Sequence, residues 1–290
     1  MVKPVRFVKM EGLGNDFIVV EEQEIVPFSS ALPLLATKLC DRHFGVGADG
    51  VIVVCNSQLA DIGMRIFNAD GSEAEMCGNG IRCLAKFVFE RRMVGKTEFA
   101  VETKAGLIFP QVVAENGRVA KVVVNMGKPR LSPQEIPVHI QGDTVVGKTL
   151  PVEERVFHFT AVSMGNPHVV IFEVPSNWED WGRTIEIHPL FPRRTNVEFV
   201  EVVSPQEARV KVWERGAGAT LACGTGACAV LVAGVLNGLL EKEARIHLPG
   251  GTLRISWKED GNVYMEGEAR EVFEGKVSEG VIKEWMSRSE

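Results

Sequence analysis

The sequence predicts an α+β protein made of two homologous halves, and two observations carry that prediction. Short runs that alternate apolar and polar residues, separated by turn residues, dominate the chain and indicate strands. Helical periodicity is confined to a few segments. The second observation is an internal repeat, in which four blocks of sequence recur in the same order half a chain later. Many strands with few helices fit an α+β fold better than alternating βαβ units.

The expected strands run from one end of the chain to the other. Each combines β-branched or aromatic residues with alternating polarity and is bounded by Gly, Pro, Asn or Asp. They are expected at 5–10, 16–22, 50–56, 121–127, 168–174, 197–203, 208–214, 252–257 and 263–269.

Three helices are expected. Residues 29–45 have serines at their start and a glycine at their end, which predicts a helix with Ser caps and a Gly stop. Apolar residues recur at helical spacing over 79–92, which predicts an amphipathic helix. The segment that follows Gly226 is apolar on every side, so we expect a helix enclosed by protein.

The repeat defines the two halves. Its four blocks pair "GLGNDFIVV" with "SMGNPHVVIF", "HFGVGADGVIVV" with "LFPRRTNVEFVEV", "MRIFNADG" with "VKVWERGAG", and "EAEMCGNGIRC" with "ATLACGTGAC". We expect the halves to face each other about a pseudo-twofold axis. The first is expected to span 1–128, joined by the C-terminal stretch 275–290, and the second 129–274.

Composition and charge exclude several classes of protein. The chain has 290 residues and a net charge of −6, and it contains no block of basic residues, which argues against nucleic acid or anionic membrane surfaces as partners. The N-terminus lacks the apolar core of a signal peptide. We expect a soluble cytoplasmic protein, or a plastid stromal one if a transit segment has been removed. The six cysteines form no C-x-x-C, so free thiols are expected rather than disulfides or a zinc knuckle.

The repeated Cys-Gly-x-Gly phrase has a physical interpretation. A strand ends, a glycine turn exposes backbone N–H groups, and a helix begins beside Cys77 or Cys223. The first N–H groups of a helix lack internal partners and bind anions such as carboxylates. The same field lowers the pKa of a nearby thiol and favours thiolate. Each phrase is therefore expected to place an activated sulfur beside a carboxylate site.

Two such sulfurs suit the inversion of a Cα–H centre. A base on one face removes the proton and an acid on the other face returns one, and thiolate and thiol can exchange these roles. Helix N-termini would stabilise the negative charge that spreads onto the carboxylate. This chemistry needs no cofactor, and the sequence contains neither a phosphate-binding glycine loop nor an evident metal cluster.

At this point the sequence resembles a known family. The motifs "KMEGLGNDF", "RHFGVGADG", "RIFNADGSEAEMCGNGIRC", "VSMGNPH", "TNVEFV" and "ERGAGATLACGTGAC" are similar to those of diaminopimelate epimerases and span most of the chain. The resemblance implies two domains, each a strand-rich barrel around a central helix, with the active site in the cleft between them. It implies pyridoxal-independent interconversion of LL- and meso-diaminopimelate, in lysine and peptidoglycan precursor synthesis, by a protein that is often a homodimer.

The resemblance also assigns residues. It implies that Cys77 and Cys223 are the catalytic thiols and that His168 and Glu214 assist them. The substrate-binding residues that it implies are Asn15, Asn68, Gly78, Asn79, Asn166, Asn196, Arg215, Gly224 and Thr225. The chain departs from the family at two places: Ala219 stands where many members have Glu, and Gly50 where some have Gln.

Other interpretations stay open at this point. The remaining cysteines, including Cys83 and Cys228 inside the expected helices, are better explained by packing than by chemistry. Asn15 and Asn68 could be ordinary turn residues. Related racemases act on proline, hydroxyproline or histidine, and a phenazine-pathway isomerase uses an acidic base. A binding protein that has lost turnover and a thiol–disulfide exchange protein are the alternatives outside this chemistry.

Overall fold

The computed structural model describes residues 4–287, which divide into two compact units. Unit 1 comprises the N-terminal part of the chain up to Val124 together with the stretch from Glu268 onward, and unit 2 comprises Asn125–Gly267. Both units are rich in sheet and contain few helices, which confirms the α+β class. The expected bounds of the homologous halves, 1–128 and 129–274, stay a prediction, because compactness does not test common ancestry.

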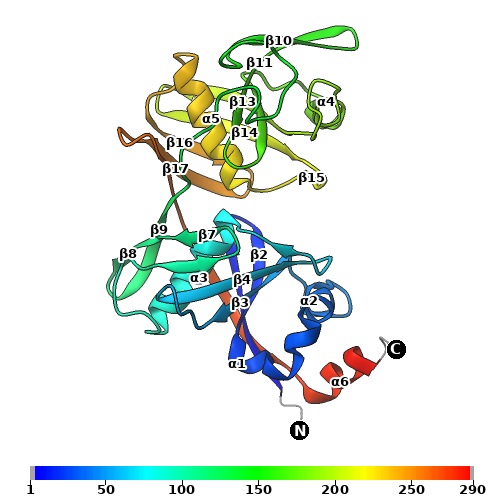
Figure 1. Cartoon of the computed structure of the whole chain (residues 1–290), viewed down its shortest axis with the longest axis vertical. Helices are drawn as coiled ribbons and strands as arrows, with labels where there is room; N and C mark the ends of the chain where they lie inside the picture. Colours follow the sequence, from blue (N-terminus) through cyan, green and yellow to red (C-terminus); the bar gives the residue numbers. More distant parts are fainter. Residues whose placement is uncertain (1–3, 288–290) are drawn as a thin grey trace. The chain divides into compact units, whose positions relative to one another are not determined.

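Unit 1 is built on one mixed sheet with the strand order β19-β1-β2-β3-β4-β6-β7, and β5 pairs with β4. The strands of unit 1 are β1 (Val5–Gly12), β2 (Asn15–Glu21), β3 (Gly50–Cys55), β4 (Ile62–Asn68), β5 (Glu73–Ala74), β6 (Val101–Thr103), β7 (Gly106–Ile108), β8 (Gln111–Glu115), β9 (Arg118–Asn125) and β19 (Arg270–Val277). Strands β8 and β9 are an antiparallel pair outside this sheet. Its helices are α1 (Glu22–Ile25), the 3-10 helix η1 (Val26–Ala31), α2 (Leu32–Cys40), α3 (Gly78–Glu90) and α6 (Glu279–Ser287). Strand β19, coloured orange-red in Figure 1, pairs with the blue N-terminal strand β1.

Unit 2 repeats this plan. Its strands are β10 (Lys148–Val152), β11 (Arg155–Ser163), β12 (Pro167–Ile171), β13 (Asn196–Ser204), β14 (Glu207–Glu214), β15 (Gly218–Ala219), β16 (Glu243–Leu248), β17 (Gly251–Trp257) and β18 (Val263–Gly267). They follow the order β10-β11-β12-β13-β14-β16-β17-β18, and β15 pairs with β14. Its helices are α4 (Trp178–Glu186) and α5 (Gly224–Leu236).

The same succession of strand pairings occurs in both units. In unit 1, β1 and β2 are antiparallel, β2 and β3 parallel, β3 and β4 antiparallel, and β4 and β6 parallel. In unit 2, β11 and β12 are antiparallel, β12 and β13 parallel, β13 and β14 antiparallel, and β14 and β16 parallel. The repeat that is visible in the sequence is therefore also present in the topology.

The helix that starts at the first glycine of each Cys-Gly-x-Gly phrase packs against the strands of its own unit. Helix α3 contacts β1, β2, β3, β8 and β19, and α5 contacts β11, β12, β13, β16, β17 and β18. Figure 1 shows α5, in yellow, among the strands of unit 2. Ten of the thirteen residues of α5 are buried, which confirms the enclosed helix expected from its all-round apolar sequence.

The prediction for 29–45 was wrong in its caps. The segment forms η1 and then α2, which starts after Ala31 without a side-chain cap and has Pro33 in its first turn. Helix α2 ends at Cys40, well before Gly45. Its buried residues join a core cluster that includes Ile18, and this packing stabilises a short helix whose local signals are weak.

Candidate active site

The two cysteines of the repeated phrase occupy equivalent positions at helix starts. Cys77 is the N-cap residue of α3 and Cys223 that of α5, and both have extended backbones, with φ of −140° and −124°. The first intrahelical bonds run from the Ile81 N–H to the Cys77 oxygen and from the Ala227 N–H to the Cys223 oxygen. The intervening N–H groups are therefore not consumed by the helix, and at each start they include the two predicted carboxylate-binding residues, Gly78 and Asn79 or Gly224 and Thr225.

In unit 1, Cys77 lies beside two of the predicted asparagines. The Cys77 thiol lies 3.7 Å from Oδ1 of Asn15, and Nδ2 of Asn79 donates to the same oxygen at 3.2 Å. Cys77 is half-buried and Asn79 is buried. The structure thus brings Asn15, Cys77 and Asn79 together.

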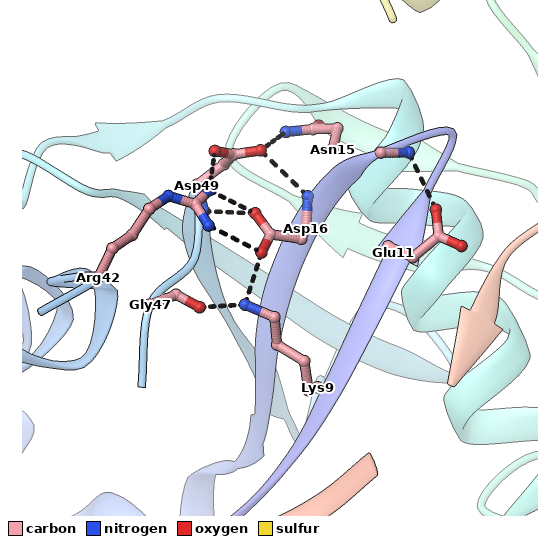
Figure 2. Close-up of polar contacts among 8 residues, drawn as sticks. Lys9, Glu11, Asn15, Asp16, Arg42, Gly47 and Asp49 are labelled. Carbon is pink, nitrogen blue, oxygen red and sulfur yellow. Dashed lines mark hydrogen bonds and ion pairs between the residues drawn. The ribbon is translucent and has the colours of Figure 1, made fainter. Parts of the chain in front are cut away.

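A charged cluster fixes the orientation of the Asn15 amide (Figure 2). Nδ2 of Asn15 donates to Oδ2 of Asp49 at 2.8 Å, and the Asp16 N–H donates to the same oxygen at 3.1 Å. Nη2 of Arg42 lies 2.8 Å from Asp49 and 2.9 Å from Asp16. A carboxylate accepts only from the nitrogen of an amide, so Asp49 turns Oδ1 of Asn15 toward Cys77.

The cluster continues inward to a buried lysine. Nζ of Lys9 lies 2.6 Å from Asp16 and also donates to the Gly47 carbonyl. Burial alone would raise the pKa of Asp16, but the hydrogen bonds and charges of Arg42 and Lys9 outweigh it and hold that pKa below its ordinary value. Asp16 is therefore a carboxylate at neutral pH.

Asn68 lies at the end of β4, opposite Gly50 of β3, and is exposed. Its Nδ2 donates to the Ser72 hydroxyl at 2.9 Å. A Cβ at position 50 would come within 2.8 Å of the Phe67 carbonyl oxygen. The pairing of β3 with β4 therefore leaves no room for a side chain at position 50, where this chain has the glycine that departs from the family pattern.

In unit 2, a chain of contacts leads from a buried carboxyl group to Cys223. Nδ1 of His168 lies 2.7 Å from Oε1 of Glu198, and Nε2 lies 2.9 Å from Oδ1 of Asn166. Nδ2 of Asn166 donates to Oγ1 of Thr225 at 3.3 Å, and that oxygen lies 3.5 Å from Sγ of Cys223. The structure thus brings together four predicted residues and adds Glu198, which was not predicted. His168 and Glu198 are completely buried.

The register of two parallel strands produces the first link of this chain. His168 of β12 pairs with Asn196 of β13, and Val170 pairs with Glu198. Residues two apart on a strand share a face, so Glu198 and His168 point to the same side of the sheet. The sequence signal for Glu198 is a charged residue inside the apolar run "VEFV", although Glu198 is not among the predicted site residues.

The pKa of Cys223 disagrees with the expectation from the sequence. Cys223 is 5% exposed, and burial raises its pKa well above the ordinary value, with Glu214 and then Glu198 adding to the effect when they are ionised. The Thr225 hydroxyl and the Gly226 N–H, which donates to Sγ at 3.4 Å, lower the pKa, but by less. The helix start does act on the sulfur as predicted, but burial dominates and the group is a thiol.

The remaining predicted residues of unit 2 form a second group. Oδ1 of Asn196 accepts from the backbone N–H of Arg215 at 2.9 Å, and Nδ2 donates to the Pro167 carbonyl at 2.8 Å. The guanidinium of Arg215 is exposed and donates to the Arg193 carbonyl. Oε1 of Glu214 accepts from the Thr220 hydroxyl at 2.6 Å.

Ala219 is exposed on β15, next to Thr220. Cys83 and Cys228 are fully buried inside α3 and α5. Burial raises the pKa of Cys83 to about 12, so its thiol stays protonated at neutral pH.

Within residues 4–287, no group of three or more His, Cys, Asp or Glu is placed to hold a metal ion, and no helix is long and apolar enough to span a membrane.

Comparisons with known proteins agree on one family. A family model described as "Diaminopimelate epimerase" matches residues 7–132 and 160–272. A diaminopimelate epimerase of Pelotomaculum thermopropionicum is 53% identical over 279 residues, which cover 94% of this chain and 98% of the relative. One of Desulfitobacterium hafniense is 52% identical over 282 residues, which cover 96% and 100% of the two chains.

Solved structures with low sequence identity share the fold. A hydroxyproline epimerase from Agrobacterium vitis, solved with bound trans-4-hydroxy-L-proline, has a TM-score of 0.68 at 15% identity and covers 95% of this chain and 91% of its own. A phenazine biosynthesis protein of Bacillus anthracis has a TM-score of 0.67 at 17% identity, with 95% and 99% covered.

Proposed function

Because the chain belongs to the diaminopimelate epimerase family and is an isomerase that converts LL- to meso-diaminopimelate, we propose that Cys77 and Cys223 are the two acid–base groups of this reaction. The observation that carries the proposal is the equivalence of the two sulfurs. Each opens a Cys-Gly-x-Gly phrase and is the N-cap residue of the helix that begins at the next residue, in units of the same topology. The reaction belongs to the synthesis of lysine and of diaminopimelate itself.

Inversion at Cα needs two groups on opposite faces of the substrate carbon. One sulfur, as thiolate, takes the proton from Cα, and the other, as thiol, delivers its proton to the opposite face. The thiol state of Cys223 suits it for delivery of the proton. The sulfurs exchange roles for the reverse reaction, so each turnover leaves the pair ready for the opposite direction.

The carboxylate of the reacting centre is proposed to bind at the two helix starts. The backbone N–H groups of Gly78, Asn79, Gly224 and Thr225 are the donors. They carry the partial positive charge of a helix N-terminus, and they would stabilise the charge that moves onto the carboxylate oxygens when Cα loses its proton.

The second amino-acid group of the substrate needs polar partners away from the reacting carbon. We assign this role to the side chains of Asn15, Asn68, Asn166, Asn196 and Arg215. The exposed guanidinium of Arg215 matches a carboxylate. His168 and Glu214 are assigned to assist the thiols. We further propose that the protein is a cytoplasmic homodimer, which sedimentation analysis of the purified chain would test.

Serine variants test the two-sulfur proposal. Cys77→Ser and Cys223→Ser should each lower the rate of epimerisation at least about a hundredfold, because a hydroxyl is a far weaker base than a thiolate. Each variant should still eliminate hydrogen halide from that epimer of an analogue halogenated next to Cα whose Cα–H faces the remaining cysteine, since elimination requires only one base. Chiral chromatography and halide release measure the two reactions.

The matched control is Cys55→Ser, which removes a half-buried thiol that lies at no helix start and should leave both reactions unchanged. Near-normal epimerisation by either of the two active-site variants would contradict the proposal.

A further inference from the structure

The contact chain from Glu198 to Cys223 has a direction that its donors and acceptors determine. Oδ1 of Asn166 can only accept, so Nε2 of His168, 2.9 Å away, carries a proton. Nδ2 of Asn166 then donates to Thr225 Oγ1. The Thr225 hydroxyl then has its own proton available for Cys223 Sγ, 3.5 Å away, in a contact where either atom can be the donor. In this arrangement, the chain ends with a donor directed at the sulfur.

The other end of the chain requires a proton between Glu198 and His168. With Nε2 protonated, the 2.7 Å contact between Nδ1 and Oε1 is either a carboxylic acid that donates to a neutral imidazole or a carboxylate that accepts from an imidazolium. Both distributions hold the same number of protons, and in both the pair has no net charge. The two side chains are completely buried, where a net charge is costly.

The second oxygen of Glu198 favours the carboxylic acid. Oε2 is buried and has no hydrogen-bond partner among residues 4–287. A bare carboxylate oxygen in that position would be a poorly satisfied buried charge, whereas the carbonyl oxygen of an acid is only an unpaired acceptor. Burial and the nearby Glu214 raise the pKa of Glu198, and His168 opposes them.

Removal of the shared proton would reverse the whole chain. A Glu198 carboxylate with neutral imidazole accepts from Nδ1, which leaves Nε2 as an acceptor. The Asn166 amide must then turn over, the Thr225 hydroxyl donates to Asn166, and the threonine oxygen accepts from the Cys223 thiol. One polarity therefore stabilises a thiolate at Cys223, and the other stabilises a thiol.

Building on the proposed role of Cys223, we propose that Glu198 is a positioning residue that sets this polarity: its proton, shared with His168, makes the chain end in a hydroxyl that donates to the Cys223 sulfur. Because Gly226 has no side chain, Glu198 and Cys223 can lie close together at the start of α5. A Cβ there would lie 2.7 Å from Oε1 of Glu198 and 3.2 Å from Sγ of Cys223. The equivalent asparagine of unit 1, Asn15, is fixed in one orientation by Asp49, whereas the Asn166 side chain has hydrogen bonds to only His168 and Thr225 among residues 4–287, and both of these partners can reverse with it.

The test is the reactivity of Cys223 toward iodoacetamide as a function of pH, quantified on its own peptide by mass spectrometry. This readout needs no turnover, so its outcome is independent of whether the two-sulfur proposal holds. The ionisable groups around the sulfur are Glu214 of β14, Glu198 of β13 and His168 of β12.

Thr225→Val removes the terminal hydroxyl and keeps the backbone N–H. It should raise the midpoint pH of alkylation and slow the reaction at pH 8 by about two- to tenfold, the value of one hydrogen bond. Glu198→Gln, whose amide supports either polarity and therefore no longer fixes one, should shift the midpoint in the same direction by a smaller amount. The double variant should shift the midpoint no further than Thr225→Val alone, because both changes act through one chain.

Two controls complete the set. Thr225→Ser should restore the wild-type midpoint, and Glu201→Gln, at an exposed glutamate on the same strand as Glu198, should leave it unchanged.

A lower midpoint in Glu198→Gln would mean that Glu198 acts as a buried negative charge and would overturn the proposal, as would additive effects or no shift. If Glu198→Gln does not fold, nitrogen NMR of His168 in the wild-type protein decides, with the signal assigned by its loss in His168→Gln. The proposal requires a proton on Nε2 at neutral pH, and a bare Nε2 with a proton on Nδ1 alone would contradict it.

Discussion

Cys223 shows that a helix start does not by itself produce a thiolate. The Gly226 N–H at the helix start is directed at the sulfur, as the sequence phrase predicts, and the Thr225 hydroxyl, which was not predicted to act there, lies beside it; both lower its pKa. Burial raises the pKa of Cys223 by more than these two groups lower it, because the interior solvates a charged sulfur poorly. The sequence could reveal the helix start from its glycines, but not the depth at which the fold buries it.

The effect of the Glu214 charge on the pKa of Cys223 can be tested directly. Glu214→Gln should lower the pKa of Cys223, because the variant removes a nearby carboxylate that opposes ionisation. Epimerisation should nevertheless fall, since Glu214 is assigned to assist the thiols. Alkylation of Cys223 across pH measures the first effect. An unchanged or higher midpoint would show that Glu214 does not act on this sulfur through its charge.

Asp16 makes the stability of unit 1 depend on pH. Its pKa in the folded protein lies below its ordinary value, so its contribution to stability is fully present above the pKa of the unfolded chain, about 4, and is lost as the pH falls through the folded value. The difference in unfolding free energy between wild type and Asp16→Asn should therefore be constant above about pH 5 and shrink below about pH 4. Urea titrations at several pH values measure it. Asp143→Asn, an exposed control, should show no such trend, and a difference that grows on acidification would contradict the account.

At the scale of elements, the helices that carry the site could be predicted better than the others. Helix α3 follows the expected amphipathic spacing, and α5 the expected all-round apolar sequence, because a Gly-x-Gly start and a long apolar run are local signals. Helix α4 was not predicted. Its apolar residues Trp178, Trp181 and Ile185 do recur at helical spacing, a signal that the prediction missed, and Ile185 packs into a core cluster that includes Phe199.

The edge strand β10 was missed for a different reason. Pro151 lies within it, and a proline argues against a strand. The strand order begins at β10, and an edge strand tolerates a missing N–H. The position of β10 at the edge of the sheet, where the missing N–H of Pro151 is tolerated, explains this strand better than the strand propensity of its residues.

Gly226 connects the start of α5 to the buried carboxyl group of β13. Gly226→Ala should lower the rate of epimerisation about tenfold or more, because its Cβ would displace Glu198 Oε1 and Cys223 Sγ from their positions. The matched control is Gly234→Ala on the same helix, where a Cβ would lie 2.5 Å from the Leu240 side chain. That variant should lower the free energy of unfolding by about 1–3 kcal/mol and leave the rate constant per folded molecule near normal. Equal losses of activity in both variants would show that Gly226 matters only for packing.

For the whole molecule, the internal repeat was the most informative signal in the sequence. It predicted two strand-rich halves, and the two units do share one succession of antiparallel and parallel pairings. It also predicted that Cys77 and Cys223 are the catalytic cysteines, whereas Cys83 and Cys228 were explained by packing inside helices. It could not predict the partners that orient the site, Asp49 and Glu198, because strand register and loop packing bring them there.

The central claim is that two different groups act on the two faces of Cα. The most direct measurement follows LL-diaminopimelate in deuterium oxide during the first few per cent of conversion, with mass spectrometry of the separated isomers. Two sulfurs with separate protons predict that the meso product carries deuterium at the inverted carbon, while the remaining LL substrate keeps its hydrogen. Hydrogen returned to the meso product, together with early deuterium in the LL substrate, would mean that a single base serves both faces and would contradict the account.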